Sequence, residues 1–162
     1  MNFHKITYPD IENYKGCRVT LWVSGCNHKC KGCHNPETWS FKSGRPFTET
    51  DKEKLLDVLK LPYIQGLTLS GGDPMYSYKE LIPLLMEIKK TMPDKDICMY
   101  TGFVLEEIQE DPSMSEILQW VDVIIDGPYV ESLRDLSIAF RGSKNQRIWV
   151  KNNGVFEISK DN

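Results

Sequence analysis

Short apolar runs recur along the chain, and each ends at a glycine or a polar turn. Four of these runs are rich in β-branched or aromatic residues, which is typical of buried strands. They cover residues 19–23, 66–70, 97–101 and 121–125. Two further runs, 147–150 and 155–158, flank the turn sequence Asn152-Asn153-Gly154 and predict a C-terminal hairpin.

Between the strands, apolar residues recur at the spacing of helices. Helices are predicted over about 48–60, over a segment ending at Met92, and from Leu105 to about Trp120. Thr48 is placed to cap the first helix. Pro83 is expected in the first turn of the second, because a proline inside a helix costs about 3 kcal/mol.

Strands that alternate with helices predict right-handed βαβ units and a parallel sheet flanked by helices. The 162 residues of the chain are too few for a closed eight-fold barrel of about 250 residues. The expected fold class is therefore α/β, as an open partial (βα) barrel with a C-terminal hairpin. No repeat, low-complexity tract or linker divides the sequence, so we expect one domain over 1–162.

Four predicted strands end in unusual tripeptides, and in α/β sheets the chemistry gathers at these ends. The tripeptides are Ser24-Gly25-Cys26, Gly71-Gly72-Asp73, Tyr100-Thr101-Gly102 and Ile125-Asp126-Gly127. A single site shared by the four strand ends is the simplest explanation.

Charge and composition narrow the possible partners. The net charge of −3 gives no general attraction to nucleic acid or to an anionic membrane, so neither is expected as a partner. No apolar run approaches the ~20 residues that span a bilayer, and the N-terminus lacks a signal-type stretch. The five cysteines, an odd number, fit a reducing compartment, so a cytoplasmic protein is expected.

Three of the cysteines, Cys26, Cys30 and Cys33, form a CxxxCxxC pattern. Thiolates are preferred ligands of iron–sulfur clusters, and three of them on a four-iron cluster leave one iron open. The amino and carboxylate groups of a methionine moiety could chelate that iron. The pattern thus favours a catalytic [4Fe–4S] cluster with one open iron, with these cysteines as its metal ligands and catalytic residues.

Other ligand sets remain open from the residues alone. A structural zinc site with His28 or His34 as fourth ligand would make the chain a non-catalytic interaction module. A cluster held by four cysteines would use Cys17 or Cys98. We expect both of these cysteines inside strands, as small apolar residues of the core.

The cysteine spacing resembles the signature of the radical S-adenosylmethionine superfamily, and the rest of the chain is most similar to the branch that activates anaerobic ribonucleotide reductases. The shared motifs are Val23-Ser24-Gly25-Cys26, Cys30-Lys31-Gly32-Cys33-His34-Asn35, Thr38-Trp39, Ser70-Gly71-Gly72-Asp73-Pro74, Tyr100-Thr101-Gly102, Asp126-Gly127 and Phe140-Arg141-Gly142-Ser143-Lys144-Asn145-Gln146. They extend over most of the chain, from about residue 8 to 146. The resemblance implies the partial barrel of that superfamily.

The resemblance also implies how the cofactor is held. Backbone around Gly32, Cys33 and His34 would approach the adenine side of S-adenosylmethionine, and the Gly71-Gly72-Asp73 turn would receive its methionine end. The chain departs from the wider superfamily at two positions: Gly32 stands where an aromatic residue is usual, and Asp73 where glutamate is frequent. Both departures are features of the ribonucleotide reductase branch.

Two polar strand-end residues complete the candidate site. The Thr101 hydroxyl could bind a ribose hydroxyl, although a strand-end threonine often faces solvent. Asp126 could reach ribose or a water molecule, although aspartate before Gly-Pro is also a common turn residue.

The resemblance implies a partner and a reaction. The partner is an anaerobic ribonucleoside-triphosphate reductase, which would receive a glycyl radical after S-adenosylmethionine is cleaved to methionine and a 5′-deoxyadenosyl radical. A different target, such as pyruvate formate-lyase or a small molecule, is the alternative. An electron donor such as flavodoxin is also implied, and Lys29 and Lys31 near the cysteines could attract an acidic donor.

Overall fold

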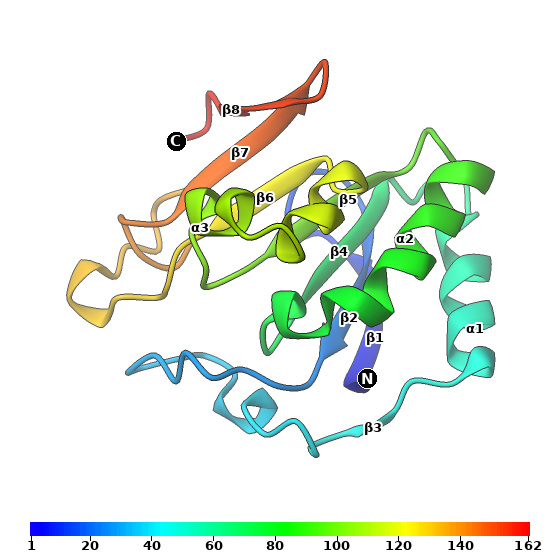
Figure 1. The fold of residues 1–162 in the computed structure, drawn as a ribbon, viewed down its shortest axis with the longest axis horizontal. Helices are drawn as coiled ribbons and strands as arrows, with labels where there is room; N and C mark the ends of the chain where they lie inside the picture. The colour runs from blue at the N-terminus through cyan, green and yellow to red at the C-terminus, as the bar shows by residue number, and fades with distance from the viewer.

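The computed structural model describes all residues 1–162 and contains one open sheet of eight strands, in the order β3-β1-β2-β4-β5-β6-β7-β8 (Figure 1). The four central strands are parallel to one another: β2 (Arg18–Val23), β4 (Gly66–Gly71), β5 (Asp96–Tyr100) and β6 (Val123–Asp126). The outer strands are antiparallel to their neighbours: β1 (Asn2–Asp10), β3 (Arg45–Pro46), β7 (Arg147–Asn152) and β8 (Val155–Ile158). The mixed α/β class, the four central strands and the hairpin are confirmed, whereas β1 and β3 were not predicted.

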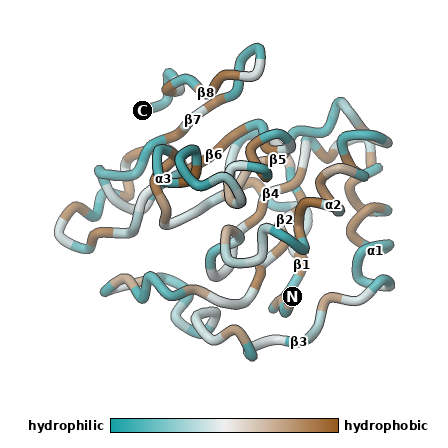
Figure 2. The backbone as a smooth tube through the Cα atoms, in the orientation of Figure 1, coloured by the Kyte–Doolittle hydropathy of each residue, from teal (hydrophilic) through white to brown (hydrophobic).

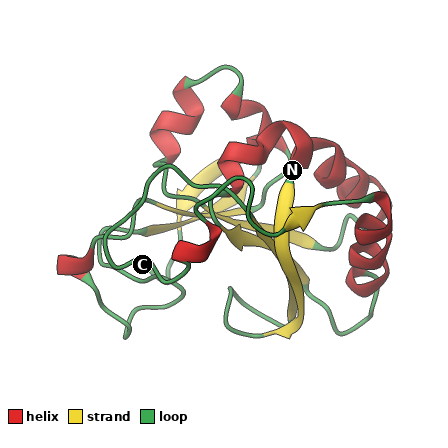
Figure 3. Ribbon diagram, turned by 90° about the horizontal axis from the view of Figure 1, so that it is seen from below, coloured by secondary structure: helices red, strands yellow, loops and turns green.

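The helices are α1 (Glu49–Leu59), α2 (Tyr78–Thr91) and α3 (Leu105–Glu110). Short 3₁₀ turns connect the elements: η1 (Pro36–Thr38), η2 (Pro74–Ser77), η3 (Met114–Gln119) and η4 (Glu131–Leu133). Figure 3 shows α1, α2 and α3 on one side of the curved sheet, with long loops on the other. None of these helices has the length and apolar character that a membrane span requires.

The two faces of the sheet bury different kinds of side chain. On the helix side, alternate residues of the central strands, such as Val19 and Leu21, join α1 and α2 in the main apolar core. Figure 2 shows the hydrophobic stretches gathered in the strands and in α2. On the opposite face the side chain of Arg18 is fully buried, and its Nε donates to Thr68 Oγ1 at 2.7 Å. This second face of the sheet is therefore partly polar. The segment 11–17 supplies hydrogen-bond partners to it, since Asn13 O accepts from the same Thr68 hydroxyl.

Three local predictions were wrong. Pro83 lies in the interior of α2, where the burial of Leu81, Leu84, Leu85 and Ile88 outweighs the backbone hydrogen bond that a proline cannot donate. The stretch 105–120 is not one helix, because Asp111 precedes Pro112 and is extended, so that α3 ends at Glu110 and η3 begins at Met114. Cys17 lies just before β2 and is half-buried, whereas Cys98 is fully buried in β5 as predicted.

The N-terminus of α1 gives a first testable prediction. Thr48 and Asp51 form a reciprocal capping box, and the Asp51 carboxylate also accepts from Arg45 Nη1 and Nη2 at 2.8 and 2.6 Å. These contacts, the Arg45 guanidinium first, lower the pKa of Asp51. We expect Asp51→Asn to lower the free energy of unfolding by about 1–2 kcal/mol.

The loss should depend on pH in a defined direction. A carboxylate whose pKa is lowered by folding stabilises the fold above its unfolded pKa of about 4, and this contribution disappears as pH falls through the folded value. The difference between wild type and Asp51→Asn in urea unfolding should therefore be full at pH 7 and shrink below about pH 4. Glu53→Gln, on an exposed side chain of the same helix, is the control and should change little. An equal loss in both variants would contradict the role of the capping box.

Candidate functional site

One pocket lies where the four parallel strands end. It is lined by Cys26, Cys30 and Cys33 from the loop after β2, by Ser70–Asp73 after β4, by Tyr100–Gly102 after β5, and by Gly127 after β6, together with His28, Tyr129 and Gln146. The four strand-end tripeptides of the sequence thus meet at one place.

The three cysteines are free thiols on the loop between β2 and η1. The thiol of Cys26 is buried, whereas Cys30 and Cys33 are half-buried. Burial raises the pKa of the Cys26 thiol, and hydrogen bonds from the backbone of His28 and Lys29 oppose this effect. The backbone N–H of Asn35 points at Cys33 Sγ at 3.4 Å.

This donor set fits an iron–sulfur cluster. Such clusters are held by cysteine thiolates, and hydrogen bonds to the sulfurs tune them. Here three free thiols face one pocket, and the Asn35 N–H is directed at one of them, Cys33. No group of three or more histidine, cysteine, aspartate or glutamate side chains is arranged to hold a single metal ion. Cys17 and Cys98 do not line the pocket.

The Gly71-Gly72 turn is bonded directly to the chain that leads into the cysteines. Gly72 N donates to Val23 O at 2.8 Å, and Asp73 N donates to Gly25 O at 2.9 Å. Gly71 has a φ of +104°, and a Cβ at Gly72 would lie 2.6 Å from Gly25 O. Glycine is needed at both positions, because a side chain would strain the first and separate the two backbones at the second.

The carboxylate of Asp73 lies at the wall of the pocket but is only 1% exposed. Its Oδ1 accepts from Met75 N at 2.9 Å, which caps η2. Its Oδ2 accepts from His28 Nε2 at 2.7 Å, from Thr101 Oγ1 at 3.0 Å and from Gly102 N at 2.9 Å. The hydrogen bond to Asp73 is the main cause that raises the pKa of His28. Both Asp73 and Thr101 are thus engaged with the protein itself.

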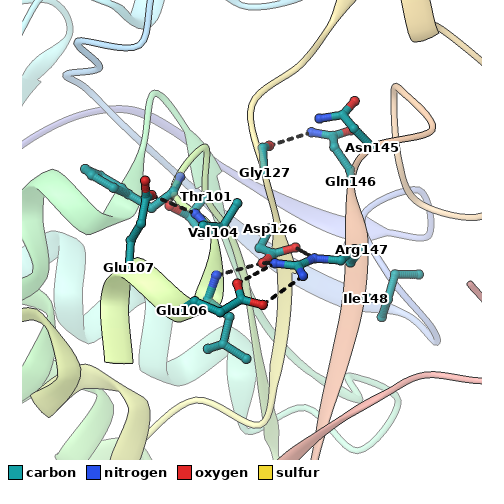
Figure 4. Close-up of polar contacts among 12 residues, drawn as sticks. Thr101, Val104, Glu106, Glu107, Asp126, Gly127, Asn145, Gln146, Arg147 and Ile148 are labelled. Atoms are coloured by element: carbon teal, nitrogen blue, oxygen red, sulfur yellow. Dashed lines mark hydrogen bonds and ion pairs between the residues drawn. The ribbon is translucent and has the colours of Figure 1, made fainter. Parts of the chain in front are cut away.

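Asp126 is placed differently from the other predicted site residues. It is fully buried and is absent from the pocket wall. Its Oδ2 accepts from Leu105 N at 2.7 Å and from Arg147 Nη2 at 2.6 Å (Figure 4). Arg147 also donates to the exposed carboxylate of Glu106, from Nη1 at 2.9 Å and from the same Nη2 at 2.7 Å. Asp126 therefore joins β6, β7 and the start of α3.

Gly32 and His34 lie on the exposed outer side of the cysteine loop. The His34 ring is 5.2 Å from the ring of Tyr129, and it lines a neighbouring groove that shares Cys33, Tyr100 and Gln146 with the pocket. The candidate cofactor-binding residues thus divide into a group on the pocket, Cys33 with Gly71–Asp73 and Thr101, and a group beside it.

Sequence reasoning missed Tyr129 and Gln146. The side chain of Gln146 donates to Gly127 O at 3.1 Å and accepts from Gly142 N at 2.8 Å, so it connects the end of β6 with the loop before β7 (Figure 4). Its position at the end of the 140–146 motif was the available signal. Arg141, the residue that stands out in that motif, instead donates to Asp161 O at 2.8 Å near the C-terminus.

Comparison with known proteins agrees with this geometry. Residues 13–149 match the family described as a 4Fe-4S single cluster domain, so the chain is of the iron–sulfur cluster class. Curated relatives cover nearly the whole chain. The anaerobic ribonucleoside-triphosphate reductase-activating protein of Enterobacteria phage T4 is 43% identical over 159 residues, which is 97% of this chain and 99% of the relative. Proteins of the same name from Pasteurella multocida and Escherichia coli K12 are 42% and 39% identical, over 92% and 90% of this chain and 97% and 96% of the relatives.

At these identities and coverages, the chain belongs to the family of anaerobic ribonucleoside-triphosphate reductase-activating proteins.

Proposed function

We propose that this protein activates an anaerobic ribonucleoside-triphosphate reductase by generating a glycyl radical on it. The observation that carries the proposal is the pocket at the strand ends, where three free thiols face the Gly71-Gly72 turn. The names of the relatives and the 4Fe-4S family match support it.

Cys26, Cys30 and Cys33 are the proposed ligands of a [4Fe–4S] cluster. The chemistry supplied by the bound cluster is the one-electron reduction of S-adenosylmethionine, which yields methionine and the 5′-deoxyadenosyl radical that removes hydrogen from a backbone glycine of the reductase. The protein binds and orients the reactants. Backbone groups of Gly71 and Gly72 receive the methionine end, while the outer loop at Gly32 and His34 faces the adenine side.

For Asp73, Thr101 and Asp126, predicted as cofactor-binding residues, we propose supporting roles. The side-chain oxygens of all three residues form hydrogen bonds within the protein. Together these bonds fix the ends of β4, β5 and β6 around the pocket. The open sheet with four parallel central strands supports the assignment of a partial barrel of the radical S-adenosylmethionine type, and a site at the strand ends of such a sheet would admit a macromolecular substrate. An electron donor such as flavodoxin would dock near the exposed Lys29 and Lys31. The five free cysteines fit a reducing compartment, the cytoplasm.

Anaerobic reconstitution tests the proposal. The full chain is loaded with iron and sulfide, reduced, and incubated with S-adenosylmethionine and the reductase of the same organism. We expect about four irons per chain, formation of 5′-deoxyadenosine and a glycyl-radical signal on the reductase in electron paramagnetic resonance. A reconstituted chain that cleaves S-adenosylmethionine but leaves the reductase without a radical would contradict the assigned target. A chain that binds zinc and no cluster would contradict the proposed chemistry altogether.

A further inference from the structure

The side chain of His28 ties the cysteine loop to the sheet. His28 lies between Cys26 and Cys30, and its Nε2 donates to Asp73 Oδ2 at 2.7 Å. It is the only side chain of residues 27–34 that hydrogen-bonds to a strand end, since the ion pair of Lys31 is 3.9 Å long and reaches Glu131 on an outer turn. His28 therefore makes the one side-chain hydrogen bond between this loop and the strand ends.

The acceptor of this hydrogen bond, the Asp73 carboxylate, is held in place independently of His28. Asp73 is 1% exposed, and three other donors fix its carboxylate: Met75 N, Thr101 Oγ1 and Gly102 N, at 2.9–3.0 Å. These donors come from the start of η2 and from the end of β5. The direction in which Asp73 accepts from His28 is thus set by the strand ends, not by the loop.

The ring of His28 also has a fitted place. Its centroid lies 4.7 Å from the Phe103 ring in an edge-on contact and 5.6 Å from the Tyr76 ring. A Cβ at Gly102 would lie 2.5 Å from His28 Cδ2, so that only glycine leaves room for the imidazole there. Packing and hydrogen bonding therefore select the same position for the side chain.

We infer that His28 is a positioning residue, which through Asp73 holds the cysteine loop in register with the Gly71-Gly72 turn. This inference rests on the proposed function. The cysteines would carry the cluster, and the turn would receive the methionine end of S-adenosylmethionine. The His28–Asp73 contact would therefore fix the position of the cluster relative to the bound S-adenosylmethionine. Outer contacts of this kind orient metal ligands, and their loss costs affinity or rate while the ligands themselves remain.

Two variants of the full chain separate the hydrogen bond from the ring. His28→Phe keeps an aromatic ring against Phe103 and Tyr76 but has no donor. His28→Gln loses the ring, yet its amide Nε2 can donate to Asp73 at a similar reach. His4→Phe is the control, because His4 lies on β1, outside the pocket, and bonds to Ser43 Oγ at 2.9 Å.

We expect all variants to bind iron as wild type does, because the three thiols are intact. In His28→Phe the change that S-adenosylmethionine causes in the electron paramagnetic resonance spectrum of the reduced cluster should weaken. Its apparent Kd for S-adenosylmethionine should rise about ten-fold or more. His28→Gln should recover a large part of both properties, and His4→Phe should match wild type.

Three results would overturn the inference. His28→Phe with the spectrum and Kd of wild type would show that the contact positions nothing, while the proposed function would stand. Equal loss of iron in His28→Phe and His28→Gln would show a role in loop stability alone. Failure of the wild-type chain to take up iron or to cleave S-adenosylmethionine would remove the proposed function and this inference together.

Discussion

Replacing Cys26, Cys30 or Cys33 by alanine is expected to reduce S-adenosylmethionine cleavage to the level of the metal-free protein. The three thiols are the cysteine side chains of the pocket, and neither Cys17 nor Cys98 lines it to substitute for a lost ligand. With two ligands the cluster would be held too weakly to survive reduction, so iron content and cleavage should fall together. Iron and sulfide per chain and 5′-deoxyadenosine yield after anaerobic reconstitution measure the effect.

Cys17→Ala is the matched control for these variants. Cys17 is a half-buried free thiol just before β2, in the same chain and open to the same oxidation, but it is not on the pocket. It should keep the iron content and the cleavage rate of wild type. A Cys30→Ala or Cys33→Ala protein that still carries a full cluster and cleaves S-adenosylmethionine would refute the ligand assignment. Loss of iron in Cys17→Ala would point to a different ligand set.

The central strands were predictable because they are buried on both faces and therefore consist of consecutive apolar or β-branched residues. The residues of β2 are buried or nearly so on both faces, and such strands appear as continuous apolar or β-branched runs. The edge strand β1 has no such run, since its burial is irregular and its pairing depends on β2. The two residues of β3 are exposed and are assigned to the sheet only through their contact with β1.

The candidate site divides in a similar way. The spacing of the three cysteines and the paired glycines are local signals, and the structure brings these segments to one pocket. Whether a strand-end carboxylate faces a ligand or a backbone amide is decided by elements far away in the sequence. Asp73 meets His28, 45 residues before it, and Asp126 meets Arg147, 21 residues after it. No periodicity or spacing in the sequence reports such contacts.

Replacement of Arg147 by methionine should cause the largest loss of stability of any single change discussed for this fold. Its guanidinium is the charged partner of Asp126, which is fully buried, and it donates through Nε at 3.1 Å and Nη2 at 2.6 Å. The neighbouring carboxylates raise the pKa of Arg147, so its charge persists at every accessible pH. Arg147→Met leaves a buried carboxylate with the Leu105 N–H as its remaining donor, which should cost about 3–5 kcal/mol.

Two comparison variants identify the source of that loss. Glu106→Gln removes only the exposed negative charge that faces Arg147 and should cost no more than about 1 kcal/mol. The double variant Asp126→Asn, Arg147→Met removes the buried charge together with its partner, while the asparagine carbonyl can still accept from Leu105 N. It should therefore be more stable than Arg147→Met alone, by about 1–2 kcal/mol. Urea unfolding of the metal-free chain at pH 7 gives all four free energies.

The order of these free energies is the decisive observation. If Glu106→Gln were as harmful as Arg147→Met, the exposed ion pair would be the main contribution and the burial of Asp126 would be irrelevant. If the double variant were no better than Arg147→Met, lost packing of the arginine stem would explain the effect. We expect the stability of the double variant to lie between those of Arg147→Met and Glu106→Gln. This order follows only if the unpaired buried charge of Asp126, at the end of β6, is the main cause of the lost stability. Since Gly127 and Gln146 adjoin Asp126 and Arg147 in sequence and line the pocket, the same ion pair then holds one wall of the site in place.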